Sequence, residues 1–159
     1  MKIYNITDKY INYLKKYDNK IPENKHEKRP FIGVIVIING YKYFAPLSSP
    51  KLKHKHMKNT KDFHKIDEGK MGVINFNNMI PVPESELIIV DIANINNIDY
   101  RNLLNNQLSF ITSINSVIEN KAKNLRSLFD KQNPTLAEQK IIDRCVIFPK
   151  IEGCCDSYK

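Results

Sequence analysis

With 159 residues, 42% of them hydrophobic, the chain is long enough for an apolar core, and we expect a single domain over residues 1–159. Charged residues make up 26% and the formal net charge is +8, which argues against a wholly disordered chain and favours an anionic partner, with nucleic acid first. No apolar run approaches the roughly 20 residues of a membrane span, so the sequence indicates a soluble, cytoplasmic protein without membrane contact.

The first thirty residues predict a short extended start, a helix and a loop. Thr7 or Asp8 can cap the helix, whose apolar residues recur at three- and four-residue steps: Tyr10, Ile11, Leu14 and Tyr17. Residues 18–30 are polar, contain two prolines and end in basic side chains, so we expect a loop there.

A β-hairpin is expected next. Residues 31–38 (FIGVIVII) are almost continuously apolar and rich in Ile and Val, which indicates a buried strand. Asn39-Gly40 follows at once, and both residues tolerate the positive φ that a tight hairpin turn needs. Residues 41–47 then form the returning strand.

The middle of the chain predicts a long basic loop followed by short strands. The loop covers residues 48–69. Two short strands are expected at 71–75 and 79–81, with a turn at 76–78 between them, and another strand at 86–91.

The last third predicts helices. One apolar stripe comprises Leu104, Leu108, Ile111, Ile114 and Ile118, and it continues after a bend through Ala122, Leu125, Leu128 and Phe129. Asn133-Pro134 suits the start of a last short helix over residues 136–145, and the tail after Pro149 is expected to be loose.

Strands early and helices late indicate an α+β fold, a curled antiparallel sheet with the C-terminal helices packed on one side. The many short strands suggest a small barrel.

The cysteines indicate neither disulfides nor a metal site. There are three, Cys145, Cys154 and Cys155, without a CxxC spacing, so we expect free thiols. The histidines have no carboxylate or cysteine at ligand spacing nearby, and we expect neither a metal nor another cofactor.

A candidate site lies where the hairpin begins and ends. Because the two strands are antiparallel, Arg29 before the first should come near Ser48, Ser49 and Lys51 after the second. Fixed cations and hydroxyl donors can stabilise charge on an RNA phosphate during cleavage without metal. Taken alone, Ser-Ser-Pro-Lys is also an ordinary turn sequence.

Basic and aromatic residues near this site are candidates for RNA binding. They are Lys28, Lys53, His54, Lys55, His56 and Tyr43. The alternative for the Lys and His run is a solvated surface loop, and His54, His56 or His64 could instead transfer protons.

Four segments together resemble the ToxN/AbiQ family of type III toxins. The most specific is residues 29–54, RPFIGVIVIINGYKYFAPLSSPKLKH, and the others are residues 2–18, 72–82 and 103–111. The resemblance implies a compact twisted SH3-like barrel similar to Kid and MazF. It also implies metal-independent cleavage of single-stranded RNA by 2′-hydroxyl attack, which leaves 2′,3′-cyclic phosphate and 5′-hydroxyl ends.

The resemblance further implies an RNA antitoxin. Repeat-derived pseudoknots would be cut by the toxin and block its active sites in a closed toxin–RNA assembly. Cellular or phage mRNA would be the substrate, and abortive phage infection the biological role.

Carried over residue by residue, the family's hydroxyl pair corresponds to Ser48 and Ser49 and its lysine to Lys51. Its cation before the first strand corresponds to Arg29, with Lys28 as a second candidate. The family often has threonine where Ser48 stands and lysine where Arg29 stands. An arginine can stabilise charge but is a poor proton shuttle, because it stays protonated.

Two other classes of function fit the residues alone. A non-catalytic RNA-binding module would need the basic loop without the hydroxyl pair. An adaptor protein would use its helical stripe for protein contact and would bind no RNA.

Overall fold

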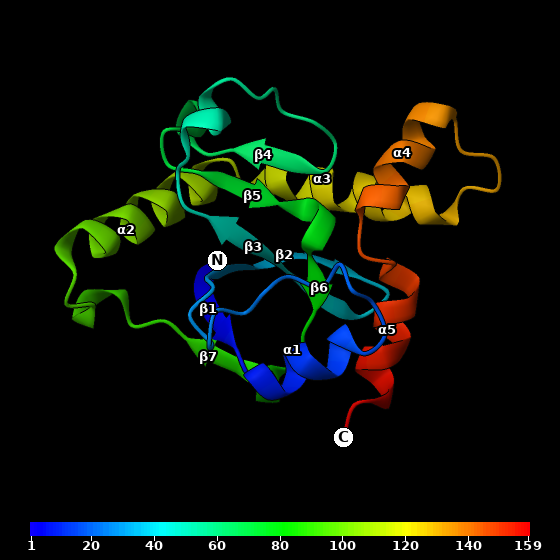
Figure 1. Cartoon of the computed structure of the whole chain (residues 1–159), viewed down its shortest axis with the longest axis horizontal. Helices are drawn as coiled ribbons and strands as arrows, with labels where there is room; N and C mark the ends of the chain where they lie inside the picture. Colours follow the sequence, from blue (N-terminus) through cyan, green and yellow to red (C-terminus); the bar gives the residue numbers. More distant parts are fainter.

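Seven strands form one curled antiparallel sheet in the computed structural model, which describes all 159 residues (Figure 1). The strands are β1 (Lys2–Ile6), β2 (Phe31–Ile38), β3 (Tyr41–Ser48), β4 (Phe63–Lys65), β5 (Val73–Asn75), β6 (Ile80–Pro81) and β7 (Leu87–Ile89). The order across the sheet is β4-β5-β3-β2-β1-β7, and β6 also pairs with β3.

The α+β class is confirmed, whereas a closed barrel is not. Strands β4 and β7 stand at the two ends of the sheet and do not pair with each other. Each has only three residues, so neither offers a long edge on which the sheet could close.

The predicted hairpin of β2 and β3 is confirmed and forms the centre of the sheet. Phe31 pairs with Pro46 and Ile38 with Tyr41, around a turn in which Asn39 has φ +52° and Gly40 φ +84°. The hairpin therefore brings the start of β2 beside the end of β3, as the antiparallel pattern requires.

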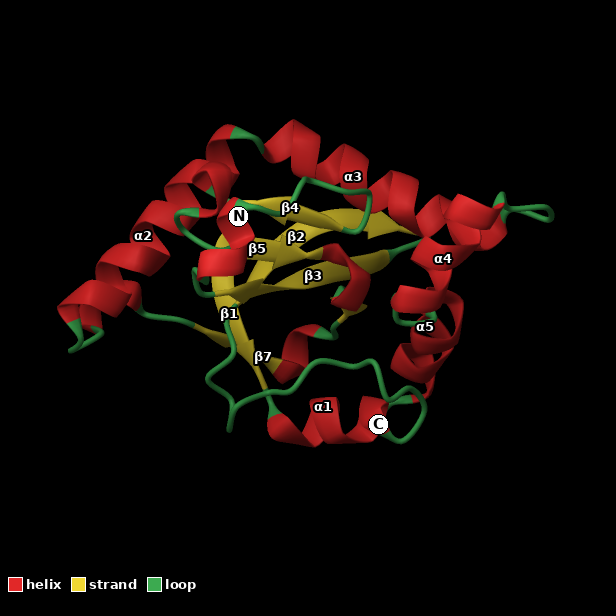
Figure 2. Cartoon of the chain, turned by 45° about the horizontal axis from the view of Figure 1, so that its top comes forward, coloured by secondary structure: helices red, strands yellow, loops and turns green.

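Five helices surround the sheet. They are α1 (Asp8–Lys15), α2 (Ile98–Ser113), α3 (Asn115–Ser127), α4 (Leu136–Arg144) and α5 (Phe148–Ser157). In Figure 2, α2 and α3 arch along one side of the sheet, α1 lies on the other, and α4 and α5 stand together at one end, beside the end of α3. None of the helices combines the length and the apolar character that crossing a bilayer requires.

The predicted start of α1 is confirmed, whereas the break between α2 and α3 and the start of α4 differ from the prediction. Thr7 caps α1, its hydroxyl accepting from the Tyr10 amide, as predicted. The break between α2 and α3 falls at Ile114, earlier than the expected bend. The cap of α4 is Thr135 rather than Asn133, because Glu138 completes a capping box with Thr135.

Two segments expected to be irregular are partly ordered. The tail after Pro149 belongs to α5, which buries Ile151 and Cys154 and pairs the Glu152 carboxylate with Arg126. The segment 48–69 contains a 3-10 turn at Leu52–Lys55 and strand β4. Each of these segments has few apolar residues. Their order depends on contacts with other elements, which the local sequence does not reveal. Cys145, Cys154 and Cys155 are free.

Candidate active site

The end of β3 separates two pockets. Ser48 is the last residue of the strand and Ser49 follows it in the exposed segment. Successive side chains of an extended chain point to opposite sides, and the two serines accordingly line different pockets. We call these the Ser48 pocket, of about 440 Å³, and the Ser49 pocket, of about 400 Å³.

The Ser48 pocket combines a hydroxyl with several cations. Its basic and amide side chains come from Lys51, Lys53, Asn75, Asn77 and Arg144. Asn75 donates from Nδ2 to the Ser48 Oγ at 2.8 Å, so the serine proton is directed away from Asn75 and is available for an acceptor. The pocket therefore suits an anionic, oxygen-rich ligand.

A short 3-10 turn positions Lys51 at the edge of this pocket. The Lys51 amide donates to Nδ1 of His54 at 3.1 Å, and His54 is only 3% exposed. Burial, with the charges of Lys53 and Lys51, holds the pKa of His54 below its ordinary value. Since Nδ1 accepts, the neutral ring carries its proton on Nε2. His54 lines the pocket, but its main contact is with the Lys51 backbone.

A glycine allows β5 to approach Ser48. Gly72 has φ +94°, and a Cβ at this position would lie 1.9 Å from the Ser48 carbonyl oxygen. A side chain would therefore separate β5, and with it Asn75, from the end of β3.

The Ser49 pocket has cations on one side and an apolar wall on the other. Lys25 and Lys28 come from the loop before β2, while Ile95 lies just before α2 and Tyr100 in its first turn. Asn5 also lines this pocket, and its Nδ2 donates to the Arg29 carbonyl at 3.0 Å, which fixes the loop against β1.

The backbone of Arg29 lies near the site, but its side chain belongs to neither pocket. The Leu47 amide donates to the Pro30 carbonyl at 2.9 Å, which confirms that the start of β2 lies beside the end of β3. However, Arg29 Nε donates to the Glu23 carbonyl, and burial lowers the pKa of the half-buried guanidinium. Its side chain lines neither pocket, and the cations beside Ser49 are Lys25 and Lys28.

The predicted RNA-binding residues divide by exposure. Lys28, Lys53, Lys55 and His56 are exposed around the two pockets. His54 and Tyr43 are the exceptions: His54 is only 3% exposed, and Tyr43 is fully buried with its hydroxyl donating to the Glu152 carboxylate. Stacking of Tyr43 on a base is therefore ruled out, since its ring packs edge-on against Phe148 in the core.

Sequence reasoning missed the residues that reach the site from distant elements. Arg144, at the end of α4, lines the Ser48 pocket and binds the Asp62 carboxylate through Nη2 and Nε, at 2.8 and 3.1 Å. Asn75 and Tyr100 were also missed. No local pattern marks these residues, although Asn75 lies within a segment of the resemblance.

Comparison with known proteins gives a consistent result. The model of the family described as "Toxin ToxN, type III toxin-antitoxin system" matches residues 2–156. The Endoribonuclease ToxN of Pectobacterium atrosepticum is 38% identical over 138 residues, which is 80% of this chain and 81% of that protein. The Endoribonuclease ToxN of Bacillus thuringiensis subsp. kurstaki is 37% identical over 163 residues, 99% and 84% of the two chains.

Solved structures are similar over nearly the whole chain. One, from work on toxin inhibition by a non-coding RNA pseudoknot, has a TM-score of 0.87 and 34% identity, covering 99% of this chain and 96% of that one. The structure of AbiQ, a lactococcal anti-phage endoribonuclease, has a TM-score of 0.81 and 26% identity, with coverage of 99% and 96%.

Proposed function

Because this chain belongs to the ToxN family of toxins from type III toxin–antitoxin systems, we propose that RNA is cleaved at the Ser48–Ser49 segment, between the two pockets. The activity is that of an endoribonuclease toxin. The observation that carries the location is the convergence of two hydroxyls and several lysines at the end of β3.

The proposed reaction needs no metal. The 2′-oxygen of one nucleotide attacks the adjacent phosphorus, and the bond from phosphorus to the 5′-oxygen breaks. The 2′-hydroxyl loses one proton and the departing 5′-oxygen gains one. The products are a 2′,3′-cyclic phosphate and a 5′-hydroxyl.

The protein's part is to hold the phosphate and stabilise its developing charge. Ser48, with its oxygen bonded by Asn75, can donate its proton to a non-bridging oxygen. Lys51 and Lys28 bring positive charge from the two sides of the Ser48–Ser49 segment. Ser49 is exposed and can orient the attacking 2′-hydroxyl.

Arg29 has a narrower proposed role than the resemblance implies. To contact the phosphate, its guanidinium must release the Glu23 carbonyl. We infer that Arg29 adds charge beside the site and that Lys28 makes the closer contact, because Lys28 lines the Ser49 pocket.

We infer the partners from the relatives. The pseudoknot antitoxin RNA of a solved relative supports a pseudoknot antitoxin here, bound in a closed toxin–RNA assembly. Cellular or phage mRNA would be the substrate, in the cytoplasm, with abortive infection as the role, which the anti-phage relatives support. We also infer that the curled sheet corresponds to a Kid/MazF-like barrel in which β4 and β7 do not meet.

The test is cleavage of single-stranded RNA in the presence of EDTA. The wild-type protein should yield 2′,3′-cyclic phosphate and 5′-hydroxyl ends, read by end-labelling and mass spectrometry. Ser48→Ala and Ser49→Ala should each slow cleavage by about a hundredfold, because each removes a group aimed at the reacting phosphodiester.

Ser85→Ala is the matched control, since Ser85 is exposed in a 3-10 turn away from both pockets. Full activity of both Ser48→Ala and Ser49→Ala would contradict the assigned site. Binding without any cleavage by the wild-type protein would instead indicate a non-catalytic RNA-binding module.

A further inference from the structure

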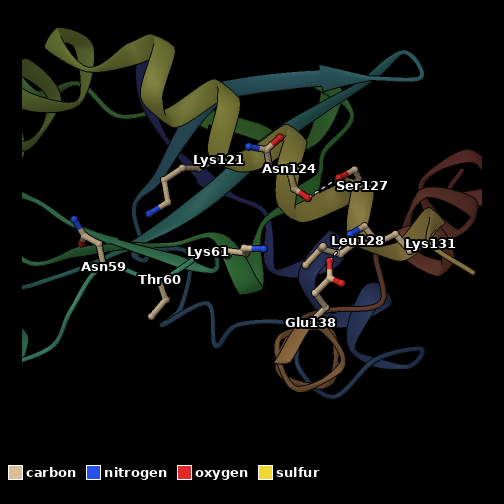
Figure 3. Close-up of a pocket in the computed structure, with 9 residues that line it drawn as sticks. All are labelled: Asn59, Thr60, Lys61, Lys121, Asn124, Ser127, Leu128, Lys131 and Glu138. Atoms are coloured by element: carbon tan, nitrogen blue, oxygen red, sulfur yellow. Dashed lines mark hydrogen bonds and ion pairs between the residues drawn. The ribbon is translucent and has the colours of Figure 1, made fainter. Parts of the chain in front are cut away.

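A third basic pocket lies along α3, outside the site described above (Figure 3). This α3 pocket has a volume of about 520 Å³. Eight of its nine lining residues are polar or charged: Asn59, Thr60, Lys61, Lys121, Asn124, Ser127, Lys131 and Glu138, with Leu128 as the apolar one. Such a lining suits a hydrated anionic ligand better than an apolar molecule.

The α3 pocket carries an excess of positive charge. Lys131 is paired with Glu138, the one carboxylate in the lining. Neither Lys61 nor Lys121 forms a salt bridge, although the charge of Asp62 acts on Lys121 at longer range. In Figure 3, Lys61 extends from the segment before β4 toward Leu128 on the opposite wall. The Lys61 ammonium and part of the hydrogen-bonding capacity of Lys121 are therefore left for a ligand.

Two contacts fix the position of the Lys121 ammonium. Its Nζ donates to the Phe63 carbonyl at 3.0 Å and contacts Nδ1 of His64 at 3.2 Å. An ammonium has three protons, so one remains for another acceptor. Burial lowers the pKa of Lys121, which means that a bound anion would relieve an unfavourable environment.

Neutral donors surround these lysines. Asn59 accepts the Lys65 amide through Oδ1 at 2.7 Å, which leaves its amide protons unused in that bond. Ser127 is not such a donor, because its one hydroxyl proton goes to the Asn124 carbonyl at 2.7 Å, drawn as a dashed line in Figure 3. Amide protons beside ammonium groups are typical partners of phosphate oxygens.

The α3 pocket adjoins the Ser48 pocket. Thr60 lines both of them, and its hydroxyl donates to Asp62, the carboxylate that binds Arg144 on the Ser48 side. An RNA strand with its reacting phosphate at Ser48 can therefore cross the Asn59–Lys61 segment at Thr60 to reach Lys61 and Lys121.

We propose that the α3 pocket binds phosphates of the substrate strand beyond the cleavage site, through Lys61 and Lys121. The proposal rests on the proposed function, because it takes RNA as the substrate. It makes the footprint of the protein on RNA longer than the active site alone, so binding should strengthen with strand length until both pockets are filled.

The test compares short and long strands that cannot be cut. Unstructured 2′-O-methyl RNA of about 4 and about 16 nucleotides, labelled for fluorescence anisotropy, lacks the attacking hydroxyl. Lys61→Ala and Lys121→Gln should each weaken the long strand by roughly fivefold and lower its log–log salt slope by about 0.7. The short strand should bind the variants and the wild type equally.

Lys140→Ala is the control, because it removes the same charge from an exposed position on α4 outside the pocket. Lys61 is exposed and its variant should fold normally, so the test does not depend on the half-buried Lys121. Thermal melting reports whether Lys121→Gln is folded.

Three outcomes would overturn the proposal: an unchanged affinity for the long strand, an equal loss for both lengths, or the same loss in Lys140→Ala. A loss confined to a folded pseudoknot RNA would assign the pocket to the antitoxin and would overturn its assignment to the substrate strand. Cleavage of a short unmodified RNA tests the proposed function separately, since that reaction should be unaffected in Lys61→Ala.

Discussion

At the scale of single residues, the two adjacent serines have different surroundings. Ser48 is fixed by Asn75 within a sheet, whereas Ser49 stands exposed beside Lys28. The alternation of side chains along an extended backbone explains this difference. The hydroxyl pair therefore works as two donors from two sides of one segment, and loss of either should leave the other in place.

His54 provides a prediction about pH. Its neutral ring accepts the Lys51 amide, and its pKa lies below the ordinary value of 6.5 because of burial and of Lys53 and Lys51. A histidine whose pKa is lower in the folded than in the unfolded protein stabilises the fold while it is neutral. This contribution is complete above pH 6.5 and is lost as the pH falls through 6.5 toward the lowered pKa.

We therefore expect the urea midpoint of the wild type to fall between about pH 7.5 and about pH 5.5, and to fall less in His54→Gln. The variant keeps His64, whose pKa is also lowered by burial, so a part of the decrease should remain. Equal decreases in the two proteins would show that His54 does not titrate in this range.

At the scale of elements, α5 depends on a buried ionic contact with α3. Arg126 donates from Nε and Nη2 to the two oxygens of Glu152, at 2.8 and 3.0 Å, and Tyr43 donates to the same carboxylate. Both charged side chains are more than nine-tenths buried. Removing one partner of such a pair leaves the other charge unpaired in the core.

Glu152→Ala should therefore destabilise the protein by about 3–5 kcal/mol, measured by urea unfolding. Glu152→Gln keeps an acceptor for Tyr43 and should cost less. Glu84→Ala is the control, because Glu84 is exposed in a surface turn. If Glu152→Ala behaved like Glu84→Ala, α5 would be as loose as the sequence suggested.

At the scale of the whole molecule, segments far apart in the sequence bind one another. The Tyr10 hydroxyl of α1 donates to the Pro81 carbonyl, and Tyr13 donates to the Cys154 carbonyl of α5. The Asp18 carboxylate accepts the Ile147 amide at 2.8 Å. These contacts join the first twenty residues to β6 and to the last fifteen residues, and they support the proposal of a single domain.

Such a molecule should unfold in one cooperative step. Far-ultraviolet circular dichroism and tyrosine fluorescence should give the same urea midpoint, because helices and buried tyrosines are lost together. Two separate midpoints would indicate that the helical third of the chain unfolds independently of the sheet.

The sequence by itself determined the features that depend on neighbours along the chain. The hairpin follows from a run of β-branched residues and Asn39-Gly40, and the start of α1 follows from Thr7. The proximity of the chain before β2 to the end of β3 follows from that hairpin, and the family follows from the segment it contains. These signals are strong because each acts over a few residues.

Only the tertiary structure decided which way the side chains point and what covers them. Arg29 turns toward the Glu23 carbonyl, Tyr43 is buried under α5, and Arg144 reaches the Ser48 pocket from α4. Thr60 joins two pockets because β4 packs beside α3. Each outcome depends on contacts between elements far apart in the chain, and a local pattern of residues holds no information about which distant surface will pack against it.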